Sequence, residues 1–281
     1  MEFTKMHGCG NDYIYFDCTR QSMDRDLASQ LAVRLSDRHF GIGGDGIILI
    51  EKGQNADFEM VMYNADGSRG AMCGNGIRCV AKYVYDHKLT DKTTVTIASM
   101  GAVKTIDIQV QDGVAVGASV DMGAPILDPA AIPVVTDCKP PVDVPITVHD
   151  KVYKMTCVSM GNPHAVVFIG RSPREFPLEQ VGPLFEHHPC FPDRTNTEFA
   201  FVQDRQNIEM RVWERGSGET LACGTGACAT AVAAILGGYV DHRVTVHLLG
   251  GDLQISWSGK AEDSVMMTGP ATTVFSGKID L

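Results

Sequence analysis

The sequence predicts a mixed α/β (α+β) protein of two structurally similar domains, each a curled, mostly antiparallel sheet around one central helix. Three observations support this fold class. The chain has 281 residues, which exceeds a typical domain of roughly 150. Its two halves resemble each other at an offset close to 150 residues. Each half also carries short strand-like segments before and after one apolar helical segment.

The repeat is clearest around a cysteine in each half. Residues 73–76 (CGNG) match residues 223–226 (CGTG), and residues 95–97 (VTI) match residues 244–246 (VTV). The common order of such matches predicts an N-terminal domain of residues 1–125 plus 271–281 and a C-terminal domain of residues 126–270. The Pro-rich stretch at 125–145 is interpreted as the connection between them. We expect the final strand-like run TTVF to return to the first domain.

The elements of each half follow from hydrophobic periodicity. Leucines at helical spacing predict a helix over 23–36, and two further helices are predicted from the Gly-x-Gly segments, over 74–86 and 224–236. The last of these is apolar nearly all round, which indicates a helix buried on every side. Alternating or apolar runs predict the strands, which are residues 46–51, 58–63, 93–98, 102–110, 114–121, 197–202, 207–213, 243–247, 252–257 and 264–267.

Composition and charge exclude several classes of protein. A hydrophobic share of 44% and a charged share of 21% are typical of a globular chain and not of a disordered or coiled-coil one. No apolar run approaches the roughly 20 residues that span a bilayer, so no membrane partner is expected. The net charge is −10 without a Lys/Arg cluster, which argues against a nucleic-acid partner. The N-terminal residues lack the pattern of a secretory signal, which predicts a cytoplasmic protein.

The cysteine count points to free thiols. Nine cysteines, an odd number, without a secretion signal argue against a disulfide scaffold. No Cys-x-x-Cys pair or Cys/His cluster has the spacing of a zinc site, so no metal is expected. Most of these cysteines are interpreted as small buried apolar residues.

Cys73 and Cys223 differ from the other seven because each precedes a Gly-x-Gly that opens the central helix of its half. Free N–H groups at a helix start bind carboxylates and lower the pKa of a neighbouring thiol. Two such starts, related by the repeat and meeting in a cleft between the domains, would place one thiol on each side of a small ligand. This arrangement suits removal of a proton from one face of a carbon and delivery to the other, without a cofactor.

Four segments carry a resemblance to a known family. MHGCGNDY at 6–13, YNADGSRGAMCGNGIRC at 63–79, SMGNPHAV at 159–166 and ERGSGETLACGTGAC at 214–228 resemble diaminopimelate epimerases over essentially the whole chain. The resemblance implies an isomerase that interconverts LL- and meso-2,6-diaminopimelate in lysine and peptidoglycan precursor synthesis. It implies no cofactor, a small-molecule substrate and a homodimer.

The resemblance also implies residue roles. Cys73 and Cys223 match the acid/base pair. The N–H groups of four residues at the helix starts would hold the α-carboxylate, namely Gly74, Asn75, Gly224 and Thr225. Five residues match positions that bind the distal amino-acid group, namely Asn11, Asn64, Asn162, Asn196 and Arg215. The amide oxygens would accept hydrogen bonds from its ammonium group, and the guanidinium would pair with its carboxylate. His164 and Glu214 match residues that orient the α-ammonium and tune the thiols. Gly46 departs from the family, in which glutamine is common there.

Four alternatives remain open at this point. A proline or hydroxyproline epimerase of the same architecture typically has histidine after the first Cys-Gly, where this chain has Asn75. A related isomerase group lacks the paired cysteines. From other classes, the two thiols could form a redox pair, and the amide side chains could belong to an amino-acid-binding protein without catalysis.

Overall fold

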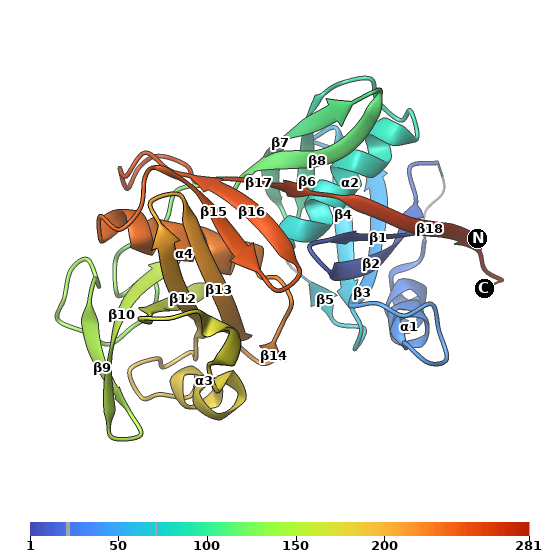
Figure 1. Cartoon of the computed structure of the whole chain (residues 1–281). Helices are drawn as coiled ribbons and strands as arrows, with labels where there is room; N and C mark the ends of the chain where they lie inside the picture. Colours follow the sequence, from blue (N-terminus) through green and yellow to red (C-terminus); the bar gives the residue numbers. More distant parts are fainter. Residues whose placement is uncertain (21–22, 71, 281) are drawn as a thin grey trace. The chain divides into compact units, whose positions relative to one another are not determined.

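The computed structural model describes residues 1–20, 23–70 and 72–280. Ala71, within the 63–79 motif, and Leu281, the end of the predicted first domain, lie outside the described residues. The chain forms two compact units. The first unit is Met1–Asp121 with Thr268–Leu281, and the second is Met122–Met267. Both are mixed α/β structures (Figure 1).

The first unit is built from strands on several sides of a central helix. Its elements are β1 (Glu2–Gly8), β2 (Asn11–Asp17), α1 (Arg25–Ser36), β3 (Gly46–Lys52), β4 (Phe58–Asn64), β5 (Arg69–Gly70), α2 (Gly74–Asp86), β6 (Thr94–Ser99), β7 (Ala102–Gln111), β8 (Val114–Asp121) and β18 (Thr272–Lys278). Helix α2 contacts β1, β2, β6, β7 and β8. Most neighbouring strands are antiparallel, whereas β2 pairs with β3 in parallel.

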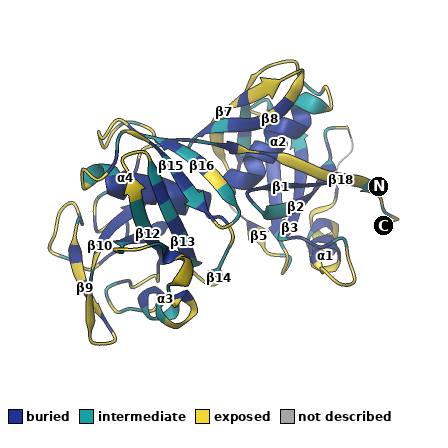
Figure 2. Ribbon diagram, in the orientation of Figure 1, coloured by how far each residue is buried: buried dark blue, intermediate teal, exposed yellow. Residues whose placement is uncertain are grey.

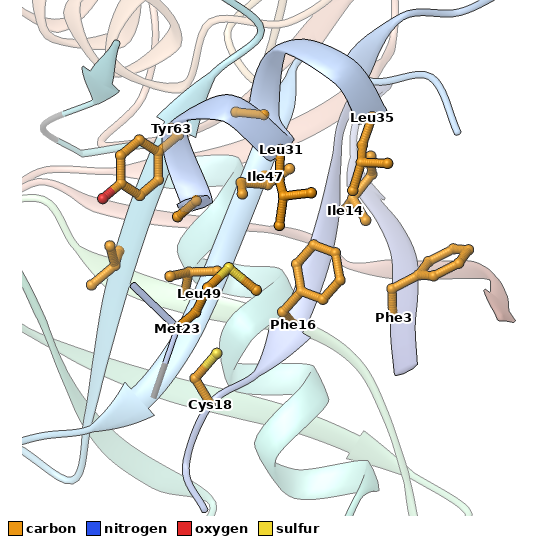
Figure 3. Close-up of a cluster of buried hydrophobic side chains, with 13 residues drawn as sticks. Phe3, Ile14, Phe16, Cys18, Met23, Leu31, Leu35, Ile47, Leu49 and Tyr63 are labelled. Atoms are coloured by element: carbon orange, nitrogen blue, oxygen red, sulfur yellow. The ribbon is translucent and has the colours of Figure 1, made fainter. Parts of the chain in front are cut away.

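Helix α1 covers a second apolar layer of the first unit. Asp24 caps its N-terminus by accepting hydrogen bonds from the N–H groups of Asp26 and Leu27. Leu31 and Leu35, one turn apart, point into a cluster with Phe16 and other buried side chains from β2 to β4 (Figure 3). The predicted third leucine, Leu27, is 38% exposed, because the buried stripe of α1 runs through Ala28 instead.

The second unit repeats this plan with additional elements. It contains β9 (Val144–Val148), β10 (Lys151–Ser159), β11 (Pro163–Phe168), a short 3-10 helix η1 (Pro173–Glu175), α3 (Leu178–Glu186), β12 (Asn196–Asp204), β13 (Asn207–Glu214), β14 (Gly218–Glu219), α4 (Gly224–Leu236), β15 (Arg243–Leu248) and β16 (Gly251–Ser256). Strand β17 (Met266–Pro270) begins in this unit and ends in the first. Helix α4 contacts β10 to β13, β15 and β16, and it is buried along most of its length (Figure 2).

Two segments were expected to lie outside the repeated elements, namely the 125–145 stretch and the final TTVF run. The 125–145 stretch is not a free connection, because Ile132 and Val134 are buried in the apolar core of the second unit with Val144. Apart from Pro145, which lies in β9, its prolines lie in irregular backbone. The TTVF run lies in β18, which pairs antiparallel with β1 of the first unit, as predicted. Among the described residues, no helix combines the length and apolarity needed to cross a membrane.

Candidate functional site

Cys73 and Cys223 occupy the same position in their respective units. Each is the N-cap of a 13-residue helix and has an extended backbone, with φ −131° at Cys73 and −113° at Cys223. The N–H of Gly76 donates to Sγ of Cys73 at 3.2 Å, and the N–H of Gly226 donates to Sγ of Cys223 at 3.3 Å. A thiolate at either position is therefore stabilised by a backbone donor and by the positive end of a helix.

The second glycine of each Gly-x-Gly leaves room for a side chain beneath the helix. A Cβ on Gly76 would lie 2.8 Å from Cδ1 of Ile48, and a Cβ on Gly226 would lie 2.6 Å from Oε1 of Glu198. Real Cβ atoms do not approach other atoms so closely, so these glycines let β3 and β12 pack against the helix starts. The repeat is therefore present in the structure as well as in the sequence. The residue beneath the helix start differs, however, because it is the apolar Ile48 in the first unit and the acidic Glu198 in the second.

In the first unit, the thiol of Cys73 donates to Oδ1 of Asn11 at 3.1 Å. The amide of Asn11 in turn donates to Oδ2 of Asp45 at 2.7 Å. Asp45 is held by Arg38, whose guanidinium also pairs with Asp12. Asn11 therefore lies between the thiol and an ion-paired carboxylate, with its oxygen turned towards sulfur.

The other predicted residues of the first unit lie at strand and helix ends. Asn64 ends β4, and its amide donates to Oγ of Ser68 at 2.9 Å. Asn75 is buried in the first turn of α2, where its side-chain oxygen accepts from Arg78 at 2.7 Å. Arg78 is completely buried and also donates to the carbonyl of Gly74. This buried cation lies within the helix start whose N–H groups are expected to bind a carboxylate.

Gly46 leaves no space for the glutamine that the resemblance leads us to expect at this position. Its φ is +156°, and a Cβ there would lie 2.0 Å from the carbonyl oxygen of Tyr63 on the paired strand β4. A side chain at this position requires the backbone to move. The first unit therefore has no amide at residue 46, and Asp45 supplies the polar side chain of this loop.

In the second unit, three strands direct polar side chains onto one sheet face. His164 on β11 pairs in register with Asn196 on β12, and Glu198 on β12 pairs with Val212 on β13. Since alternate residues of a strand share a face, Glu214, two residues after Val212, lies on the same face as Glu198. Helix α4 covers these strands.

His164 and Glu198 form a fully buried pair. Nδ1 of His164 lies 2.7 Å from Oε1 of Glu198, and both side chains are 0% exposed. Nε2 of His164 lies 3.1 Å from Oδ1 of Asn162. The ring of His164 thus lies between a carboxyl oxygen and an amide oxygen. The oxygen of this amide, which was expected to accept from an ammonium, faces the ring of His164.

Asn196 and Arg215 are connected by a hydrogen bond rather than lying as separate ligands. The side-chain oxygen of Asn196 accepts from the backbone N–H of Arg215 at 2.9 Å, and its amide donates to the carbonyl of Pro163 at 2.7 Å. The exposed guanidinium of Arg215 donates to the carbonyl of Asp193. Asn196 is buried and fixes the backbone at the end of β13, from which Arg215 extends.

The surroundings of Cys223 correct the expectation that its helix start lowers the pKa. Burial raises the pKa of the Cys223 thiol well above its usual range, and the negative charges of Glu214 and Glu198 add to this effect. The hydrogen bonds with Thr225 and Gly226 act in the opposite direction but are weaker. Burial also raises the pKa of Glu214, although hydrogen bonds from Thr220 and Cys223 oppose this. Burial and carboxylates therefore outweigh the helix N-terminus here.

Sequence reasoning missed Glu198, Asp45 and Arg78. The first two lie on or next to predicted strands, and a charged residue within an otherwise apolar strand, as in the NTEFAF run of β12, is the signal that could have identified Glu198. The expectation of small buried residues holds for Cys9, Cys18, Cys79, Cys157 and Cys228, whereas Cys190 is half-buried and Cys138 is exposed.

Comparison with known proteins identifies the family. The model of the diaminopimelate epimerase family matches residues 3–127 and 156–274. A diaminopimelate epimerase of Methanococcus maripaludis is 53% identical over 281 residues, which are the whole of both chains. One of Acetivibrio thermocellus is 52% identical and is covered over 99% of its length.

Solved structures of similar fold extend the comparison. A probable proline racemase from Agrobacterium radiobacter covers the whole chain and is itself covered over 93%, with a TM-score of 0.72 at 14% identity. A hydroxyproline epimerase from Agrobacterium vitis covers 99% of this chain and is covered over 91%, with a TM-score of 0.70 at 13% identity. These likenesses show the fold, and the matches at about 50% identity show the relationship: the chain belongs to the diaminopimelate epimerase family.

Proposed function

We propose that this protein interconverts LL- and meso-2,6-diaminopimelate by two-base chemistry, with Cys73 and Cys223 as the acid/base pair. One thiolate removes the α-proton, and the thiol on the other side of the carbon delivers a proton to the opposite face. The observation that carries the proposal is the repeated N-cap geometry, in which each Sγ accepts a backbone N–H at 3.2–3.3 Å.

Each helix start has backbone N–H groups that can donate hydrogen bonds to the α-carboxylate. In the proposed complex, the N–H groups of Gly74 and Asn75 and those of Gly224 and Thr225 bind this group, because N–H groups in the first turn of a helix have no partner within the helix and point towards a ligand at its start. Removal of the α-proton shifts negative charge onto the carboxylate, so the same donors stabilise the transition state more than the ground state. The thiols and these donors suffice for the reaction, which we propose to be cofactor-independent.

The thiol of Cys73 has hydrogen-bond partners for both of its protonation states. As a thiol it donates to Oδ1 of Asn11, and as a thiolate it accepts from the N–H of Gly76. A residue that acts as an acid in one direction and as a base in the other requires both kinds of partner. For Cys223, Glu214 and Thr225 are the neighbouring polar groups, and Glu214 is also proposed to orient the α-ammonium.

The remaining polar side chains are proposed to hold the distal amino-acid group. Arg215 presents an exposed guanidinium that suits a carboxylate, and Asn64 and Asn162 present half-buried amides. Asn11 and Asn196 have their side-chain oxygens bonded to Cys73 and to the N–H of Arg215, so we propose that they mainly position these two residues.

Exchange at the α-carbon tests the proposal directly. LL-diaminopimelate is incubated with the reduced protein in D₂O, and deuterium at the α-carbon is followed by mass spectrometry together with formation of the meso isomer. We expect both, with and without a metal chelator and without added pyridoxal phosphate. A reduced protein that gives no exchange contradicts the proposal. Exchange without conversion of the isomer would refute the delivery of a proton from the opposite face.

The two compact units, Met1–Asp121 with Thr268–Leu281 and Met122–Met267, are proposed to be the two domains of this enzyme, which the sequence predicts at residues 1–125 plus 271–281 and 126–270. Each contributes one thiol, because a single half has only one Cys-Gly-x-Gly helix start. We further propose a cytoplasmic homodimer, supported by the family and by nine free thiols. Sedimentation equilibrium measures the mass, and a monomer would contradict the dimer without bearing on the reaction.

A further inference from the structure

Arg78 is a buried cation that the fold of its helix does not require. Its side chain is completely buried, one turn after the start of α2. The equivalent residue of the second repeat, 150 residues later, is Cys228 in α4, which is also completely buried. Since a small apolar side chain occupies this position in one repeat, packing of the central helix does not explain an arginine in the other. Burial of a guanidinium is costly unless its contacts compensate.

The guanidinium of Arg78 is directed at the first turn of α2. Nη1 donates to the carbonyl of Gly74 at 3.0 Å, and Nη2 donates to Oδ1 of Asn75 at 2.7 Å. Nε donates to the carbonyl of Pro270 at 3.2 Å. Both terminal nitrogens therefore contact the two residues of the first unit whose N–H groups are proposed to bind the α-carboxylate.

One peptide unit links Arg78 to the proposed carboxylate site. The carbonyl of Gly74 and the N–H of Asn75 belong to the same planar, trans peptide bond, so they point in opposite directions. A donor that fixes the carbonyl therefore also fixes the direction of the N–H. The positive charge on the carbonyl side further polarises the peptide, because hydrogen bonds in such a chain strengthen one another. The N–H of Asn75 is accordingly a stronger donor to an anion than the N–H of an ordinary helix start.

The strand that covers Arg78 holds the guanidinium in this place. A Cβ on Gly8, at the end of β1, would lie 2.9 Å from Nη2 of Arg78 and 3.1 Å from Cβ of Asn75. Glycine at residue 8 therefore allows the backbone of β1 to pack directly on this pair. Because β1 and α2 enclose the guanidinium completely, its bonds to the first turn do not compete with bulk water.

We propose that Arg78 is a positioning residue for the epimerisation, which holds the Gly74–Asn75 peptide so that its N–H stabilises the negative charge that develops on the α-carboxylate. The inference rests on the proposed function and deepens it, because it makes the two helix starts unequal. The start of α2 is backed by a cation, whereas the start of α4 lies above the carboxyl group of Glu198. Since the charge on the carboxylate is larger in the transition state than in the bound substrate, Arg78 acts on kcat more than on KM.

Three substitutions separate this role from the structural role of a buried cation. Arg78→Met removes the charge and all donors but keeps an unbranched side chain. Arg78→Lys keeps the charge, but a single ammonium cannot reproduce the fork of the guanidinium. The matched control is Lys82→Met, one turn further along α2. Lys82 is also a buried cation, but it binds Asp86 and the carbonyl of Ala115, and not the helix start.

The kinetic measurement is kcat and KM for diaminopimelate, with folding checked by circular dichroism. We expect Arg78→Met to lower kcat by about 10–100-fold, the range typical for loss of a partner that orients a reacting group, with little change in KM. Arg78→Lys should be intermediate, and folded Lys82→Met should keep both constants of the wild type. A wild-type kcat in folded Arg78→Met overturns the proposal, as does a loss confined to KM. An equal loss of kcat in Lys82→Met overturns it too.

A second measurement observes the N–H of Asn75 itself. When glycine carries ¹³C at its carbonyl and asparagine carries ¹⁵N, a carbonyl-selected NMR spectrum shows only Gly–Asn peptides, and Asn75 is assigned by loss of its signal in Asn75→Ser. In Cys223→Ala, which keeps the first helix start, added LL-diaminopimelate should move this N–H signal downfield, as a hydrogen bond to a carboxylate does. Addition of Arg78→Met should reduce that shift.

Arg78→Lys replaces Arg78→Met in the NMR experiment if the latter does not fold. An equal shift of the Asn75 signal with and without the Arg78 substitution overturns the inference, as does the absence of a shift when the substrate binds. The two proposals fail in different ways. If the wild type shows no α-proton exchange, the proposed function fails and the inference fails with it. If exchange occurs and the Arg78 variants keep the wild-type kcat, the inference alone fails.

Discussion

The thiol of Cys73 donates a hydrogen bond to the side-chain oxygen of Asn11, at 3.1 Å. This oxygen is directed at sulfur because the NH₂ group of the same amide donates to Asp45, which is itself paired with Arg38. The thiol of Cys73, at the start of α2, therefore has a hydrogen-bond acceptor in Asn11 as well as a backbone donor in Gly76. If Cys73 transfers a proton as proposed, Asp45 helps to position its hydrogen-bond acceptor without touching the thiol.

Replacing Asp45 with alanine should therefore impair catalysis. The Asn11 amide loses the acceptor that orients it, so the bond to Cys73 weakens. We expect kcat/KM to fall by about 10–100-fold, as for other residues that orient a reacting group. Steady-state epimerisation measures this. Asp91→Ala, at an exposed aspartate of the same unit, is the control and should behave as the wild type. Unchanged activity in Asp45→Ala would contradict the role assigned to the Asp45–Asn11 bond.

Removal of either proposed acid/base thiol should abolish epimerisation. In Cys73→Ala and Cys223→Ala, one side of the α-carbon has no group that can give or take the proton, and we expect kcat to fall by at least about 10²–10⁴-fold. The deuterium assay checks this. Cys138→Ala removes an exposed thiol and should be neutral. Normal turnover in either of the first two variants would refute the two-base mechanism, and an active protein with a Cys73–Cys223 disulfide would favour the redox alternative.

The parts of the fold that could be predicted are those with strong local signals. The bounds of α2 and α4 are as predicted, because Gly-x-Gly marks each start and an apolar stripe marks the length. Strands β1, β2 and β9 to β11 and helix α3 were not identified. Helix α3 contains Pro183 and begins after Pro177 without a side-chain cap, so its local sequence resembles a loop. The 125–145 stretch was predicted as a connection, and its local sequence does not reveal that Ile132 and Val134 pack into the core of the second unit.

The candidate site could likewise be predicted only in part from the sequence. The repeat identifies the two thiols and the helix starts, because these features are local in sequence. The surroundings of a side chain are not local: the ring of His164 lies between Asn162 and a glutamate 34 residues further along the chain on the neighbouring strand. The elevated pKa of Cys223 is equally non-local, since it depends on burial and on the charges of Glu214 and Glu198. Such effects require the register of β11, β12 and β13.

Glu214→Gln should make Cys223 more reactive towards alkylation. Burial and the charge of Glu214 both raise the pKa of this thiol, so it is protonated at neutral pH, and its thiolate fraction grows as the pH rises towards that pKa. Removing the charge lowers the pKa, so at a given pH below it more thiolate is present. The rate of iodoacetamide labelling, read by peptide mass spectrometry, should rise in the variant. Labelling of the exposed Cys138 is the internal control. Slower or equal labelling of Cys223 would contradict this account.

Asp12→Asn should destabilise the first unit at neutral pH but not in acid. Burial raises the pKa of Asp12, but hydrogen bonds and charge from Arg38 and Lys5 outweigh burial and hold it below its usual range. A depressed carboxyl pKa contributes stability above the pKa of the unfolded chain and loses it as the pH falls through the folded value. Asp12 is largely buried, with its side chain 15% exposed, beside a Lys5 side chain that is 7% exposed. Leaving Lys5 without this partner costs about 3 kcal/mol.

Chemical denaturation at several pH values measures that difference. The free energy of unfolding of Asp12→Asn should be lower than that of the wild type at pH 7, and the two curves should converge in the acid range where the wild-type Asp12 is protonated. Asp91→Asn, at the exposed aspartate used above, should follow the wild type throughout. A difference between Asp12→Asn and the wild type that is independent of pH would exclude the ion pair as its cause.

Gly226→Ala should destabilise the protein, although alanine is the better helix former by about 1 kcal/mol. The new Cβ would lie 2.6 Å from Oε1 of Glu198, which cannot easily retreat because it is bonded to His164 in a closed interior. Overpacking of this kind costs about 1–3 kcal/mol. Gly170→Ala is the control, because a Cβ there meets no atom within 4 Å. If the clash with Glu198 is the cause, Glu198→Ala should largely remove the effect of Gly226→Ala in a double-mutant cycle of unfolding free energies. Additive effects would show instead that Gly226 is required for a reason other than the carboxylate beneath it.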